Sequence, residues 1–171
     1  LKSFEMLDFT YEIVTNISIG ITNTRQFVNF TEVIVPNNYQ TRNGAKFKAR
    51  ALQYALELNA SRLNQDDWIV HLDEESVLTE SVVVGITEFV NKNVHPIGQG
   101  LVTYGKCDPI VNWTTTLMDN TRVAHDLGSL RFALKHLNRP LFCFKGSFVV
   151  CKLEVEESVS YDHGLEGSIA E

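Results

Sequence analysis

The chain has 171 residues, 44% of them hydrophobic and 21% charged, and its 21 acidic and 15 basic side chains give a net charge of −6. This composition excludes a disordered tail, and the acidic balance argues against non-specific nucleic-acid binding, which needs clustered Lys and Arg. No apolar run approaches the roughly 18 residues typical of a membrane span, and charged residues interrupt any leader-like stretch at the start. The length predicts one domain with a single core.

The cysteines are odd in number and have no close pair: Cys107, Cys143 and Cys151. They give neither a disulfide framework nor a zinc pattern, which indicates buried thiols in a reducing compartment. Four N-glycosylation triplets favour the opposite compartment, but such triplets are common by chance; they begin at Asn16, Asn29, Asn59 and Asn112.

Alternating patterns predict two short strands, at Tyr11–Thr15 and Glu32–Val35, followed by a turn at Pro36–Asn38. Asn43 is a candidate N-cap for a helix whose apolar residues recur with helical spacing: Phe47, Ala51, Tyr54, Ala55 and Leu58. A polar break follows at residues 64–67, and Trp68–Leu72 is typical of a short buried strand.

The second half continues this alternation. Thr79 is a candidate N-cap for a helix with one apolar face: Val82, Val83, Ile86, Phe89 and Val90. Ile97–Tyr104 predicts a strand, and Val111–Leu137 predicts a long helix interrupted near Gly128. Leu141–Lys152 predicts a last strand with a bulge at Gly146. Strands alternating with helices of this length indicate a mixed α/β sheet.

Acidic residues follow the buried strand directly, where open α/β sheets bind ligands: Asp73, Glu74 and Glu75. Because side chains alternate along extended backbone, Asp73 and Glu75 share a face and can hold Mg²⁺ or Mn²⁺, which neutralises a diphosphate. A solvated acidic turn is the alternative interpretation. Upstream, Gly44 and Lys48 mark a helix start with the character of an anion site, and an ordinary amphipathic helix is the alternative there.

These two motifs together resemble family 2 glycosyltransferases, in which a Lys-Ala-x-Ala-Leu-Asn-like helix precedes a strand that ends in Asp-x-Asp. Here the helix segment is Lys48–Gln53 and the strand segment is Trp68–Glu75. Further segments resemble the egghead-type β-1,4-mannosyltransferases within that family: Arg42–Gly44, Gly98–Tyr104, Val111–Trp113, Lys145–Ser147, Ser160–Gly164 and Gly167–Glu171. The resemblance extends over about residues 11–171.

The resemblance implies a GT-A fold, an α/β architecture with a mixed, mostly parallel sheet flanked by helices. It implies inverting transfer of mannose from GDP-mannose to the glycolipid glucosylceramide in β-1,4 linkage, assisted by Mn²⁺ or Mg²⁺. It also implies attachment to the endoplasmic reticulum or Golgi membrane through segments outside residues 1–171, with the catalytic domain facing the cytosol. We therefore expect one incomplete glycosyltransferase domain, without its first strand and the region after Glu171.

Residue roles follow from the same resemblance. The donor-binding set is Asn16, Asn43, Gly44, Lys48, His71, Asp73 and Glu74, and the metal ligands are Asp73 and Glu75. The acceptor-side set is Trp113, Lys145, Gly146 and Ser147. Glu171 matches the first member of the family's catalytic acidic pair, whose second member, an Asp, is the general base.

The chain departs from the family at three places. One is the metal motif, which ends in Glu75, as in the egghead-type proteins, and not in the commoner Asp. Asn16 stands where the family has a base-binding Asp, and the general-base Asp expected after Glu171 is not in the chain. We therefore expect this piece alone to bind donor weakly and not to turn over. A non-catalytic GT-A-like binding module and a transferase that uses a UDP-sugar are the alternatives.

Several of these residues also have a structural interpretation. His71 fits a core histidine as well as a donor contact, and Trp113 fits a core aromatic residue better than a sugar platform. Asp162 and His163 fit ordinary turn chemistry better than an acid–base pair.

Overall fold

The computed structural model describes residues 9–20, 29–73, 76–102, 112–139, 141 and 147–167. The chain divides into two compact units. The first unit comprises Leu1–Asp67 and Lys152–Glu171, and the second comprises Trp68–Cys151. Within the described residues, no helix combines the length and apolar character needed to cross a bilayer.

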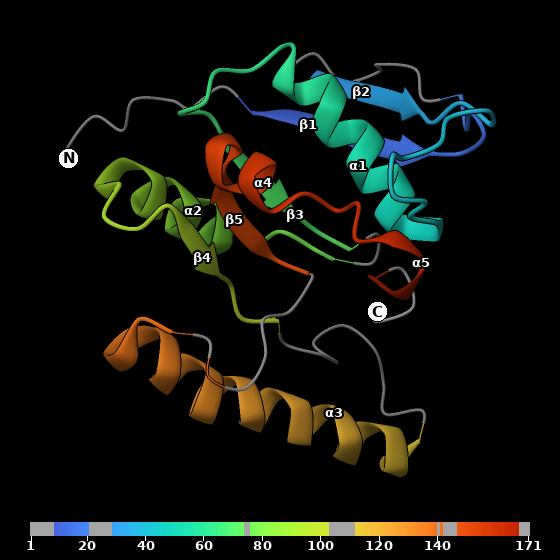
Figure 1. Cartoon of the computed structure of the whole chain (residues 1–171). Helices are drawn as coiled ribbons and strands as arrows, with labels where there is room; N and C mark the ends of the chain where they lie inside the picture. The colour runs from blue at the N-terminus through green and yellow to red at the C-terminus, as the bar shows by residue number, and fades with distance from the viewer. Residues whose placement is uncertain are drawn as a thin grey trace. The chain divides into compact units, whose positions relative to one another are not determined.

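In the first unit, strand β1 (Thr10–Thr15) pairs in parallel with β2 (Asn29–Ile34). Helix α1 (Phe47–Ala60) packs against β1 and against the short helix α4 (Leu153–Val159), and α5 (Gly164–Gly167) follows (Figure 1). Apolar side chains from β2, α1, α4 and the segment between β2 and α1 form the core: Val33, Val35, Ala45, Ala49, Ala55, Leu56 and Leu153. The predicted strands and helix are confirmed, although β2 begins earlier than its alternation indicates.

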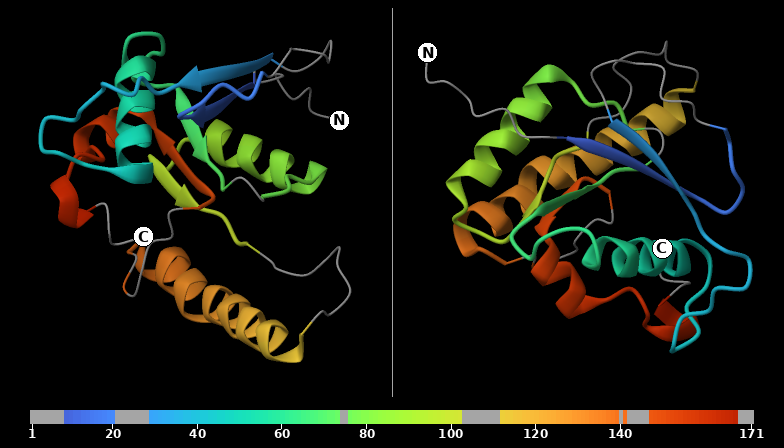
Figure 2. Two further views of the ribbon diagram at one scale, coloured as in Figure 1. Left: turned by 90° about the vertical axis from the view of Figure 1, so that its right-hand side faces the viewer. Right: turned by 90° about the horizontal axis from the view of Figure 1, so that it is seen from above.

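In the second unit, three strands form a sheet in the order β3 (Trp68–His71), β5 (Val149–Lys152), β4 (Ile97–Gln99) (Figure 2). Strand β4 runs antiparallel to β5, with Gln99 opposite Val149. Helix α2 (Glu80–Lys92) connects β3 to β4 in the chain. Thr79 is the N-cap residue of α2, as predicted.

Glycine allows close packing between α2 and this sheet. A Cβ atom added at Gly98 on β4 would lie 2.7 Å from the Phe89 ring of α2, so only glycine fits there without a shift. The same Phe89 ring meets Trp68 of β3 edge to face, with ring centroids 5.6 Å apart.

The long helical stretch is confirmed, with its interruption at the predicted place. Helix α3 (Trp113–His125) continues into two π-helical turns, η1 (Asp126–Leu130) and η2 (Ala133–Leu137), and Gly128 lies within η1. Its buried residues fall in the π-helical part: Asp126, Leu130 and Ala133.

The described strands are shorter than predicted at β4 and β5. Strand β4 ends at Gln99 because its partner strand begins only at Val149. Phe148 has a φ of +55°, outside the extended region, and therefore cannot continue β5 toward the N-terminus. The bulge predicted at Gly146 lies outside the described residues.

Mixed α/β architecture is confirmed. The described strands form a two-stranded parallel sheet and a separate three-stranded sheet that contains an antiparallel pair, not one mostly parallel sheet. Helices α4 and α5 are not predicted from the sequence, because seven and four residues are too short to establish a helical period.

Candidate functional site

The turn that leads into α1 is fixed by a carboxylate from the distant end of the first unit. Asp162 accepts hydrogen bonds from the backbone N–H of Asn43 at 2.6 Å and of Ala45 at 3.2 Å. The Asn43 side-chain amide donates to the Asp162 carbonyl at 2.8 Å, and Thr41 Oγ1 accepts from the Ala45 N–H at 2.7 Å. The sequence position of Asn43 predicts that it is the N-cap of α1, and this prediction is wrong. Lys46 precedes the helix instead.

Asp162 is ionised over a wide pH range. Burial opposes its charge, but hydrogen bonds from the Thr41 hydroxyl and from the N–H groups of Asn43, Ala45 and Gly164 outweigh burial and hold the pKa of its carboxyl below the usual value. Only 8% of the residue is exposed. A charged carboxylate with several N–H partners is a strong structural anchor.

The predicted donor residues of this turn are accessible to solvent. Asn43, Gly44 and Lys48 are all exposed. Gly44 has a φ of +83°, a conformation that residues with a Cβ rarely adopt, which explains glycine at this position. Phe47 begins α1 and is 70% exposed, between Lys46 and Lys48.

Asn16 is held at the end of β1 by an arginine from α1. Arg50 donates to Asn16 Oδ1 at 3.0 Å and to the carbonyls of Pro36 and Tyr39 at 3.1 and 3.0 Å. The guanidinium thereby joins three segments of the first unit, and Asn16 offers its amide oxygen to Arg50 where a carboxylate would form an ion pair.

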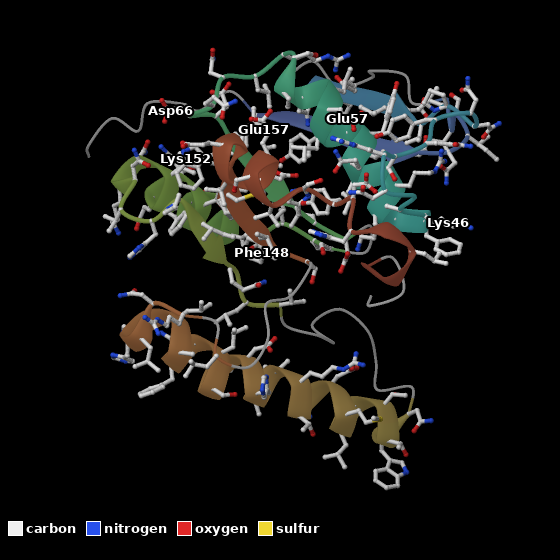
Figure 3. The ribbon with its side chains drawn as sticks, viewed as in Figure 1. Lys46, Glu57, Asp66, Phe148, Lys152 and Glu157 are labelled. Atoms are coloured by element: carbon white, nitrogen blue, oxygen red, sulfur yellow. The ribbon has the colours of Figure 1, made fainter. Side chains whose placement is uncertain are left out.

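A separate ion pair lies near the start of α4. Lys152 Nζ donates to Asp66 Oδ1 at 2.8 Å, and the two residues are labelled in Figure 3. The hydrogen bond and charge of Lys152 lower the pKa of the Asp66 carboxyl. The Asp66 side chain is 88% exposed, so water screens this pair.

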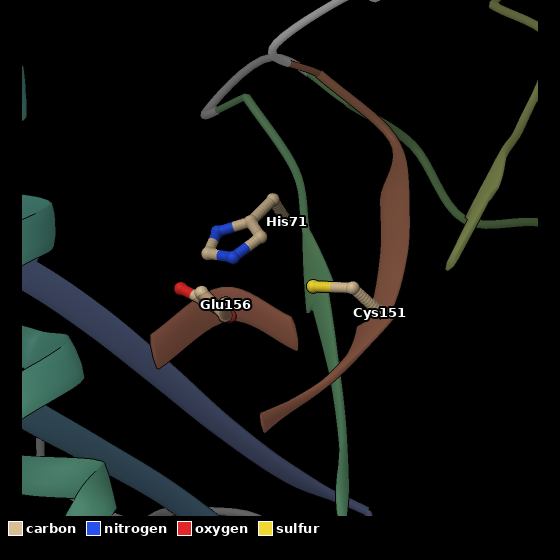
Figure 4. A group of neighbouring side chains, drawn as sticks. All are labelled: His71, Cys151 and Glu156. Atoms are coloured by element: carbon tan, nitrogen blue, oxygen red, sulfur yellow. The ribbon is translucent and has the colours of Figure 1, made fainter. Parts of the chain in front are cut away.

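In the second unit, His71 and Asp73 mark the end of β3, and both are half-buried. The Asp73 carbonyl accepts from the Ser76 N–H at 2.9 Å, which turns the chain after the strand. Figure 4 labels His71 on β3 and Cys151 on the neighbouring strand β5, whereas Glu156 belongs to the first unit. Glu74 and Glu75 lie outside the described residues, so their predicted roles stay predictions.

The acceptor-side residues are described in part. Ser147 is half-buried, and its carbonyl accepts from the Gln99 side chain at 2.8 Å. Trp113 begins α3 and is 74% exposed, so the interpretation of Trp113 as a core aromatic is wrong. The remaining predicted residues, Lys145, Gly146 and Glu171, lie outside the described part of the chain.

The relationship to known proteins follows from sequence comparison. The model of glycosyl transferase family group 2 matches residues 68–171. The chain belongs to this family. Glycosyl transferase family 2 membership agrees with the resemblance carried by the Lys48–Gln53 and Trp68–Glu75 segments.

Among curated proteins, the family 2 chain is similar to β-1,4-mannosyltransferase bre-3 of Caenorhabditis briggsae and of Caenorhabditis elegans, each 52% identical over 166 residues. It is 50% identical over 164 residues to β-1,4-mannosyltransferase egh of Drosophila melanogaster. These matches cover 96–97% of this chain and 35–36% of each relative, so the chain spans about a third of their length. No solved structure matches.

Sequence reasoning did not foresee the long-range contacts of two residues that organise the first unit of this glycosyltransferase chain. Asp162 and Arg50 hold the predicted donor residues Asn43 and Asn16 through hydrogen bonds to distant segments. The signal for Asp162 was its place in the Ser160–Gly164 segment of the resemblance. Spacing alone shows no partner for a residue more than a hundred positions away.

Proposed function

We propose that the protein to which this chain belongs is an inverting β-1,4-mannosyltransferase that moves mannose from GDP-mannose to glucosylceramide. The observation that carries the proposal is the 50–52% identity, over nearly the whole chain, to proteins named β-1,4-mannosyltransferases. The GDP-mannose donor, the glycolipid acceptor and the GT-A fold rest on the resemblance of the sequence motifs. Location at the endoplasmic reticulum or Golgi membrane, with the catalytic domain facing the cytosol, belongs to the same proposal.

The chemistry is a single displacement at the anomeric carbon. A general base takes the proton of the acceptor hydroxyl, its oxygen attacks the anomeric carbon, and the nucleoside diphosphate leaves with inversion. Glu171 belongs by resemblance to the acidic pair that supplies this base. Negative charge grows on the leaving diphosphate, and Lys48 at the first turn of α1 supplies a cation for it.

Asp73 and Glu75 would hold a divalent cation. Asp73 fits this role because it presents a half-buried carboxylate just beyond the carboxyl end of β3, and carboxylate oxygens are ligands that Mg²⁺ and Mn²⁺ prefer. When bound, the metal supplies positive charge to the departing diphosphate. His71, Asp73 and Glu74 complete the proposed donor contacts of the second unit, and Trp113 with Lys145, Gly146 and Ser147 the acceptor side.

Asn16 is the residue that we assign to the nucleotide base of the donor. Asn16 replaces the family's acidic residue, and its amide oxygen already accepts from Arg50. An amide whose oxygen is engaged presents N–H groups, which suit the O6 and N7 acceptors of guanine. A UDP-sugar donor, or a non-catalytic module, is the second candidate, favoured by the same replacement.

The test uses the full-length protein in membranes, supplied with glucosylceramide and with either GDP-mannose or UDP-glucose, with and without Mn²⁺. We expect Mn²⁺-dependent transfer from GDP-mannose only. Glu75→Ala should lower the rate on the order of a hundredfold or more, because a metal ligand is lost. Glu80→Ala, at the exposed first residue of α2, is the matched control and should keep the wild-type rate.

Other outcomes separate the alternatives. Transfer from UDP-glucose in place of GDP-mannose keeps the enzyme and changes the donor. No transfer from either donor, in a protein whose folding is verified by circular dichroism, rejects the transferase and favours the binding module. Equal losses in Glu75→Ala and Glu80→Ala reject the metal role of Glu75.

A further inference from the structure

The C-terminal part of the first unit reaches back to the turn that precedes α1. Asp162 bonds to Asn43 across 119 positions and to Ala45 across 117. The turn residues Thr41 and Ala45 are buried, while Asn43 and Gly44 between them are exposed. The carboxylate therefore anchors the buried side of a turn whose exposed side carries predicted donor residues.

A second contact joins the same two segments. Gly164 has a φ of +74°, and a Cβ atom placed there would lie 3.3 Å from the Asn43 carbonyl oxygen. The backbone of the C-terminal segment thus approaches the turn more closely than a larger residue allows. Both the hydrogen bonds and the close approach fix the position of Asn43.

We propose that Asp162 is a positioning residue for the donor: it holds the turn Thr41–Ala45, and the first turn of α1 that follows, in the conformation that binds the nucleotide sugar. This inference rests on the proposed function. It adds to that function a residue that touches no substrate itself and acts through Asn43 and Lys48. Preorganised contacts to the donor lower the cost of binding, so the loss of Asp162 weakens binding more than it slows the chemical step.

The segment that contains Asp162 also precedes the predicted acidic pair in the sequence. Helix α5 ends at Gly167, and Glu171 follows four positions later in the sequence. One carboxylate thereby ties the turn with the predicted donor residues to the segment that leads to the predicted catalytic residue. The contacts of Asp162 with Asn43 and Ala45 all lie within the first unit.

The principal test is Asp162→Asn in the full-length protein. Asparagine has nearly the same shape but turns an N–H₂ group toward backbone N–H donors, so at least one hydrogen bond is lost. We expect the KM for GDP-mannose to rise about tenfold or more, with kcat at saturating donor within about threefold of wild type. Amide hydrogen exchange at Asn43 and Ala45 should accelerate at least tenfold, since the turn opens locally.

The matched control is Asp66→Asn. It removes the same charge from the same unit, where Asp66 is exposed and pairs with Lys152 away from the turn. Its KM for GDP-mannose and its exchange rates at Asn43 and Ala45 should stay at wild-type values.

If Asp162→Asn does not fold, Thr41→Val provides a milder probe of the same anchor, because valine keeps the shape of threonine and loses the hydroxyl that accepts from the Ala45 N–H. We expect a threefold rise in KM for this variant, on the order of half the logarithmic effect of Asp162→Asn.

Three results would overturn the inference: an unchanged donor KM, a fall in kcat without a rise in KM, or an equal effect in Asp66→Asn. A different result, in the wild-type protein, would reject the proposed function. If the wild-type protein transfers no sugar at all, the function is rejected. Unchanged exchange at Asn43 and Ala45 in Asp162→Asn then rejects the anchoring role independently, and accelerated exchange supports it.

Discussion

Helices α1 and α3 begin in opposite ways. Lys46 at the start of α1 makes no side-chain cap hydrogen bond, and the turn before it is bound by Asp162 from the far end of the sequence. Asn112 caps α3 locally, accepting from the Thr114 N–H at 2.9 Å. The start of α1 is thus fixed by a tertiary contact, and the start of α3 by a local hydrogen bond between Asn112 and Thr114.

The two helices also differ in burial. Helix α1 buries one side of its length, at Ala49, Ala55 and Leu56, whereas Trp113–His125 of α3 contains no buried residue among those described. A helix with few buried contacts depends on its own capping and propensity, and one with a buried face depends on its neighbours. Substitutions in the two helices should therefore differ in size. Substitutions of two glycines beside them, Gly164 against the turn before α1 and Gly128 in the stretch after α3, should differ in sign.

The largest difference is expected for leucine truncation. Leu56→Ala removes a side chain that is 4% exposed in the core of the first unit and should lower the free energy of unfolding by about 2–4 kcal/mol. Leu117→Ala makes the same change on α3, where the residue is 57% exposed, and should change it by about 0.5 kcal/mol or less. Denaturant unfolding of both variants measures the pair, and equal losses would show that α3 is buried in the intact protein.

Glycine substitutions should act in opposite directions. Gly164→Ala introduces a Cβ at a φ of +74° and 3.3 Å from the Asn43 carbonyl, which should destabilise by about 1–3 kcal/mol. Gly128→Ala has no atom within 4 Å of the new Cβ, in the helical stretch that follows α3, and should stabilise by roughly 0.5–1 kcal/mol. Thermal unfolding decides both signs, and stabilisation by Gly164→Ala would contradict the tertiary anchor.

The contrast between local and long-range contacts also explains which features can be predicted from the sequence and which cannot. Apolar spacing at Phe47–Leu58 and Trp113–Leu137 identifies both helical stretches, because amphipathic periodicity is local information. The sequence predicts that Asn43 caps α1, but the backbone and side-chain N–H groups of Asn43 donate to Asp162, and Lys46 stands at the N-cap position instead. A partner 119 positions away leaves no trace in local spacing.

In the candidate site, too, local patterns are predictable from the sequence and long-range contacts are not. Asp73 could be placed at the end of a strand from the pattern of Trp68–Leu72, and the strand is confirmed. Arg50 was not singled out, although it binds Asn16, Pro36 and Tyr39, because an arginine on an amphipathic helix usually faces water. Recognition of a long-range hydrogen-bond network requires the fold.

The cap of α3 provides a smaller and purely local effect. Asn112→Ala removes the acceptor of the Thr114 N–H and should lower stability by about 1 kcal/mol, with faster amide exchange confined to the first turn of α3. Asn112→Ser is the matched control, since serine is an equally good N-cap, and should remain within a few tenths of a kcal/mol of wild type. Exchange that spreads to the strands of the second unit would contradict a local role.

The last prediction concerns pH and has the smallest effect near neutrality. Acid should loosen the turn before α1 and leave the cap of α3 unchanged. The pKa of Asp162 lies below its usual value of about 4, so its contribution to stability is complete above pH 4 and is lost as the pH falls through the lower folded-state pKa. Asn112 does not titrate, so the cap of α3 persists in acid. Amide exchange at Ala45, corrected for its intrinsic pH dependence, should therefore accelerate below pH 4, whereas exchange at Thr114 should not.

In Asp162→Asn the acid-dependent acceleration at Ala45 should disappear, because the titrating group is gone. Its persistence would assign the acid sensitivity to another carboxyl, with Asp66 the next to substitute, since Lys152 lowers the pKa of that group as well.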